Sequence, residues 1–72
     1  MDKAAALHYL RYKVEEDEPV FILRGGDMLA PATIFAWVEG ASLHRVAQPK
    51  IESAVQTAGE FLRYEGPKKL PD

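Results

Sequence analysis

The sequence predicts a mainly α-helical domain of three short helices, with one short extended segment between the first and the second helix. Three stretches with helical spacing of apolar residues, separated by breaks that contain proline or glycine, favour this fold class. The chain has 72 residues and a hydrophobic fraction of 47%, which fits one small globular domain. We expect residues 1–66 to form this domain and residues 67–72 to be a C-terminal tail that is loose unless Leu70 docks.

The first helix is predicted from Asp2 to about Val14. The Asp2 carboxylate is a favourable N-cap, because it can accept hydrogen bonds from the free amides of the first turn. Alanines follow, and they are the strongest helix formers. The apolar stripe comprises Leu7, Leu10 and Val14. The acidic run Glu15–Glu18 and then Pro19 end the helix, since anions are unfavourable at a helix C-terminus.

The segment Val20–Leu23 is open to two interpretations. Its β-branched and aromatic residues favour a short extended segment or strand. Pro19 just before it and Gly25 just after it are also compatible with a single helical turn. We favour the extended form, although a short apolar run cannot be assigned from periodicity alone.

The second and third helices are predicted from apolar residues that recur at helical spacing. The second begins between Asp27 and Pro31 and continues to about His44. Its stripe comprises Ile34, Trp37, Val38 and Ala41. The third has Pro49 in its first turn, where proline loses no hydrogen bond, and it stops at Gly66. Its stripe comprises Ile51, Ala54, Val55, Ala58 and Leu62. We expect the three stripes to form the core together.

Composition excludes several classes of function. The net charge of −2 argues against a general nucleic-acid binder, which presents a strongly basic surface. The absence of cysteine and the wide separation of His8 and His44 argue against a metal site or metal cofactor. No set of nucleophile, base and orienting group can be assembled, so we expect no enzyme activity. No long apolar span or signal-peptide pattern is present, and we expect a cytoplasmic protein.

The turn Arg24-Gly25-Gly26-Asp27 is the most informative local feature for function. Glycine-rich backbone before a helix start can bind an anion through free amides, and Arg24 would add a charged clamp. We expect Arg45 or Arg63 to supply a second positive charge, and Trp37 or Tyr64 to stack on a base. The structural alternative is that Arg24 pairs with Asp27, which itself caps the helix.

The apolar residues outside the three stripes predict self-association. Very small domains without disulfides often gain stability by forming oligomers, and a symmetric dimer is the commonest form. The residues left over are Val20–Leu23, Phe35 and Tyr64, which we expect at a subunit interface. A monomer with a modest core remains compatible with this length.

One string of residues near the middle of the chain carries a family resemblance. It comprises Pro19-Val20-Phe21-Ile22-Leu23-Arg24, Asp27, Leu29-Ala30-Pro31 and Trp37. This string resembles small, functionally uncharacterised accessory proteins of tailed phages and prophages. A looser match runs from about Leu7 to the tail, and the resemblance does not extend to Gly25-Gly26. It implies a short accessory protein that acts by binding in the host cytoplasm, either blocking a host enzyme or sequestering a signalling molecule used in defence.

These observations predict a homo-oligomeric, non-enzymatic protein that binds and sequesters a small anionic, nucleotide-like ligand between subunits. The alternative is a protein-binding inhibitor or regulator of a host factor such as RNA polymerase or a nuclease. A structural component of the virion is a third interpretation, and an enzyme comes last.

Overall fold

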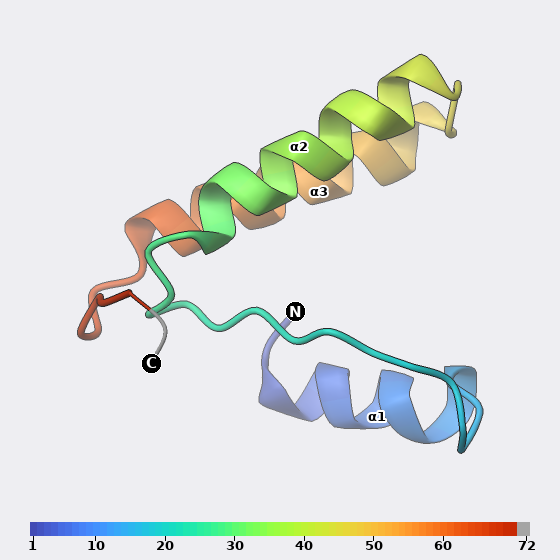
Figure 1. Cartoon of the computed structure of the whole chain (residues 1–72), viewed down its shortest axis with the longest axis horizontal. Coiled ribbons are helices and arrows are strands. Elements are labelled where there is room, and N and C mark those ends of the chain that lie inside the picture. Colours follow the sequence, from blue (N-terminus) through green and yellow to red (C-terminus); the bar gives the residue numbers. More distant parts are fainter. Residues whose placement is uncertain (71–72) are drawn as a thin grey trace.

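Three helices, α1 (Lys3–Lys13), α2 (Ala30–Leu43) and α3 (Gln48–Arg63), make up the fold. A computed structural model describes residues 1–70 of the chain. It confirms the predicted mainly helical fold with a short segment between the first two helices. Figure 1 shows α2 and α3 side by side as a hairpin, with α1 set apart below them. Within residues 1–70, no helix is both long and apolar enough to cross a bilayer.

Local signals hold α1 in helical form. The Asp2 carboxylate accepts a hydrogen bond of 2.9 Å from the Ala5 amide, which confirms the predicted cap. Arg11 and Lys13 lie in the last turn, where positive charge is favourable. However, α1 contains no buried residue, and none of its Cα atoms lies within 8 Å of α2 or α3. The prediction that its stripe contributes to a shared core is therefore wrong for this chain alone.

The core lies between α2 and α3. Its buried side chains are Ala30, Ala41, Ile51 and Ala58. Three of these four are alanines, so the two helices can approach closely. The predicted stripe of α2 is buried only in part, because Trp37 is 49% exposed. Trp37 shares the helical spacing of Ala30 and Ala41, so its position on the helix does not by itself account for its exposure.

A tight turn joins α2 to α3 at Arg45, whose backbone is left-handed with a φ of 56°. The Val46 amide donates to the Ala41 carbonyl at 2.9 Å, and the Arg45 amide donates to the Ser42 carbonyl at 3.2 Å. These two bonds form a Schellman motif, in which glycine is the usual residue at the left-handed position. Arg45 therefore bears a conformational cost that glycine would avoid.

Arg45→Gly is expected to stabilise the hairpin by about 1 kcal/mol, because glycine adopts the left-handed conformation without a Cβ clash. Thermal unfolding followed by circular dichroism measures the effect. Arg45→Ala is the control, since alanine removes the charge but keeps the Cβ. A stabilisation of equal size in both variants would show that the charge, and not the backbone, is responsible.

The segment between α1 and α2 is an open, unpaired run of chain. Residues 18–24 belong to no helix or strand, which excludes the helical-turn interpretation of Val20–Leu23. Figure 1 shows this segment stretched out between α1 and the hairpin. Residues 19–23 make no backbone hydrogen bond with any other residue in the range 1–70. The extended form is thus observed, without a partner strand in the described part of the chain.

The C-terminal segment packs back onto the start of α2. The Lys69 amide donates to the Gly26 carbonyl at 2.9 Å, and the Met28 amide donates to the Lys69 carbonyl at 2.9 Å, in a short parallel bridge. The Lys68 ammonium donates to the carbonyls of Phe61 and Leu62 at the end of α3, each at 3.1 Å. The predicted loose tail is therefore attached through residue 69, and residues 71–72 of that prediction lie outside the described range.

Candidate functional site

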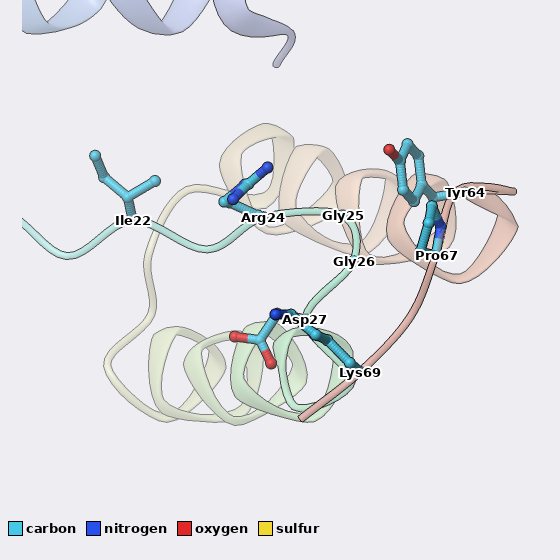
Figure 2. A pocket seen from close by; sticks show the side chains of 8 residues that line it. All are labelled: Ile22, Arg24, Gly25, Gly26, Asp27, Tyr64, Pro67 and Lys69. Atoms are coloured by element: carbon cyan, nitrogen blue, oxygen red, sulfur yellow. The ribbon is translucent and has the colours of Figure 1, made fainter. Parts of the chain in front are cut away.

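A hollow of about 570 Å³ lies where the glycine turn meets the C-terminal segment (Figure 2). Its lining comprises Ile22, Arg24, Gly25, Gly26, Asp27, Tyr64, Pro67 and Lys69. The open segment and the turn before α2 supply one wall, and the residues after α3 supply the other. We call this hollow the turn–tail pocket.

The turn itself is fixed by two hydrogen bonds. The Asp27 amide donates to the Arg24 carbonyl at 3.0 Å. The Asp27 carboxylate accepts from the Leu29 amide at 2.8 Å and so holds the chain just before α2. Figure 2 shows the side chains of Arg24 and Asp27 pointing to different sides. The predicted helix cap is wrong, because the N-cap of α2 is Leu29 and no side chain in the described range caps the first turn. The proposed ion pair between Asp27 and Arg24 is not formed either.

The two glycines of the turn are required for close approach. Neither has a positive φ, so the conformational freedom of glycine is not what the turn uses. A Cβ built on Gly25 would lie 3.0 Å from Cγ of Tyr64, and one built on Gly26 would lie 2.6 Å from the Pro67 carbonyl oxygen. The bare backbone therefore lets the C-terminal segment pack directly against the turn.

Tyr64 forms part of the pocket wall. Its ring packs against Gly25 from the turn and against Gly66 from its own segment. The residue is still 49% exposed, so part of the ring faces solvent. Tyr64 is therefore both a packing residue and an accessible aromatic surface, which is compatible with partial stacking on a planar ligand.

The charges and donors of the pocket favour an anion. Arg24 and Lys69 are cationic, and among the lining residues within the range 1–70 Asp27 supplies the one carboxylate. Within residues 1–70, the Arg24 guanidinium has no hydrogen-bond or ion-pair partner, and the amides of Gly25 and Gly26 donate no hydrogen bond. A guanidinium and two adjacent free amides match the acceptor oxygens of phosphate or carboxylate.

Three of the predicted ligand-binding residues do not reach this pocket. Arg45 lies in the α2–α3 turn, at the opposite end of the hairpin in Figure 1. Arg63 folds back along α3, where its guanidinium lies 3.0 Å from a Cβ built on Gly59. Trp37 is on α2 and is not part of the lining. The sequence prediction missed Lys69, because only the docking of the tail brings it to the turn.

Comparisons with protein-family models, with curated proteins and with solved structures find no match to this chain or its fold. Among residues 1–70, no group of three or more metal-ligating side chains is close enough to hold a metal ion. The functional interpretation therefore depends on the geometry of the turn–tail pocket.

Proposed function

We propose that this chain is a non-enzymatic, self-associating binding protein of phage type that sequesters a small anionic, nucleotide-like ligand. The turn–tail pocket carries the proposal, because it brings Arg24, the two glycine amides, Tyr64 and Lys69 to one hollow. A volume of about 570 Å³ falls in the ordinary range of small-molecule sites.

The roles of the residues follow from their chemistry. The Arg24 guanidinium and the amides of Gly25 and Gly26 bind the phosphate oxygens of the ligand. Lys69 contributes a second positive charge from the other wall. The exposed part of the Tyr64 ring contacts the base or another planar group. Asp27 is not a ligand contact in this scheme, because its carboxylate holds the Leu29 amide.

The test is a titration of the isotopically labelled chain with inorganic phosphate, adenosine monophosphate and a cyclic nucleotide, followed by amide NMR. We expect the amide signals of Gly25 and Gly26 to shift with at least one nucleotide. Arg24→Gln is expected to weaken binding about tenfold or more, since a hydrogen bond to a charged group contributes about 1.5–3 kcal/mol.

Arg63→Gln is the matched control, because it removes an arginine that lies outside the pocket lining. Its affinity is expected to equal that of the unmodified chain. A shift caused by phosphate alone, equal to that caused by the nucleotides, would restrict the ligand class to simple anions. A folded chain whose glycine amides respond to no member of the panel would refute the proposal.

A protein-binding inhibitor of a host factor is the second candidate. Three consecutive apolar side chains, Val20, Phe21 and Ile22, favour it because all three are exposed. Exposed apolar patches commonly mark protein interfaces. Co-elution of the chain with purified bacterial RNA polymerase or a nuclease would support this role, and separate elution from each would count against it.

A further inference from the structure

The chain exposes far more surface than a compact protein of its mass. Its accessible area is 6339 Å², whereas folded monomers of 8.0 kDa expose about 4,450 Å². The excess is about 1,900 Å², and stable dimers bury about 800 Å² or more per partner. The radius of gyration of 13.2 Å also exceeds the value of about 11 Å expected for 72 residues. This chain therefore has enough surplus surface for a stable interface.

The open segment between α1 and α2 concentrates the features of an unpaired strand. Phe21 is 84% exposed and Ile22 is 66% exposed, with Val20 also exposed beside them. The backbone of residues 19–23 has no hydrogen-bond partner within the described chain. An extended, apolar backbone with free amides and carbonyls is a template for pairing with another strand.

We propose that residues 19–23 of two copies of this chain pair as antiparallel strands across a two-fold axis at Phe21. The strand does not extend to Glu18, because the Glu18 amide is already bonded to the Glu15 carbonyl. We take the partner to be a second copy of this chain because the charges at the two ends of the segment are complementary. Four carboxylates, Glu15–Glu18, lie at one end, and Arg24 lies at the other. Antiparallel pairing centred on Phe21 places Glu18 directly opposite Arg24 of the second copy. Parallel pairing would instead bring like charges together, which is unfavourable.

Pro19 selects which backbone groups face the second copy. Proline has no amide hydrogen, so it is disfavoured at a hydrogen-bonding position of the pair. The backbone N–H and C=O groups of successive residues point alternately toward the partner strand and away from it. Because Pro19 takes an outward position, the backbone groups of the even-numbered residues in the strand point toward the second copy. Val20 and Ile22 then exchange backbone hydrogen bonds across the axis. The two Phe21 residues form the close pair without hydrogen bonds, where their side chains are nearest to each other.

This interface does not depend on the proposed ligand. The guanidinium of Arg24 has five N–H donors, so a carboxylate of the second copy on one edge leaves donors for an anion on another. Loss of phosphate binding would therefore leave the dimer intact, and failure to dimerise would leave the turn–tail pocket of each chain in place.

Sedimentation equilibrium of the full chain tests the pairing. We expect a concentration-dependent dimer that Phe21→Lys converts to a monomer, because a lysine at the centre of the pair is repelled by its own copy. Leu43→Lys is the matched control; Leu43 is 78% exposed at the far end of α2, and the change should leave the dimer unaltered. Both side chains are exposed, so neither variant should unfold the chain.

Two further readouts separate strand pairing from nonspecific apolar association. Hydrogen exchange at the Val20 and Ile22 amides should slow as the concentration rises, while exchange at Phe21 and Leu23 should not. Glu18→Arg should weaken the dimer, and combination with Arg24→Glu should restore it. A monomer at every concentration, a dimer insensitive to Phe21→Lys, or equal protection of all four amides would overturn the proposal.

Discussion

Gly26→Ala is expected to destabilise the packed C-terminal segment by about 1–3 kcal/mol, a typical cost of forcing extra atoms into a packed site. The new Cβ would lie 2.6 Å from the Pro67 carbonyl oxygen, and that neighbour is backbone that cannot rotate away. The Lys69 amide bonds to Gly26 itself, so displacement of the segment also disrupts the short bridge. Urea unfolding followed by circular dichroism, together with the exchange rate of the Lys69 amide, measures the loss.

Gly40→Ala is the matched control for Gly26→Ala. A Cβ at this position, within α2, meets no atom within 4 Å outside the backbone of its own helix turn. Alanine should therefore stabilise the helix by about 0.5–1 kcal/mol relative to glycine. The same substitution thus has opposite expected signs at two glycines of one chain. A change in the free energy of unfolding of the same sign at both positions would contradict the close approach of Pro67 to the turn.

Ile51→Ala is expected to remove most of the stability of the α2–α3 hairpin. Truncation of a buried isoleucine to alanine costs about 2–5 kcal/mol, and a domain this small rarely has more than about 3–5 kcal/mol in total. Ile51 is the largest side chain among the four buried residues, the other three being alanines. The three buried alanines have no side-chain rotamers with which to fill the space.

Val55→Ala on the same helix is the comparison for Ile51→Ala. Val55 lies one turn further along α3 and is 43% exposed, so its truncation should cost less than about 1 kcal/mol. Chemical denaturation of both variants measures the loss in free energy of unfolding that each substitution causes. A loss for Val55→Ala as large as that for Ile51→Ala would indicate that Val55 is covered in solution, by α1 or by a second copy.

Helix boundaries could be predicted from the sequence because their signals are local. The carboxylate of Asp2 caps the first turn of α1, and Pro31 and Pro49 stand in the first turns of α2 and α3. These residues act within one turn of their own position, so no knowledge of the tertiary fold is needed. The observed ranges differ from the predicted ones by at most a few residues.

The core could be predicted only in part. Periodicity identifies the apolar face of a helix but does not identify what covers that face. In α3 the predicted stripe is correct for Ile51 and Ala58, which α2 buries. In α1 the stripe is present, yet no other helix packs against it. The apolar surplus inferred from composition corresponds to this uncovered helix and to the open segment.

The candidate site could also be predicted only in part. The turn from Arg24 to Asp27 was recognisable as a glycine-rich motif before a helix, and Tyr64 was predicted, like Trp37, as an aromatic residue that could stack on a base. The close approach of the C-terminal segment that the glycines permit could not be predicted, since it depends on residues distant in the sequence. Lys69 could not be found, because a lysine in a polar tail carries no local sign of docking.

The attachment of the C-terminal segment has a consequence for measured affinities. One wall of the pocket is held by the bridge at Lys69 and by the Lys68 contacts to the end of α3, which are few and exposed. Such a segment opens at a lower free energy than the helices do. The apparent dissociation constant of any ligand then equals the intrinsic one divided by the fraction of molecules with the segment closed. Substitutions at the end of α3 will therefore alter the measured affinity by changing the fraction of molecules with the segment closed. They need not remove any contact to the ligand.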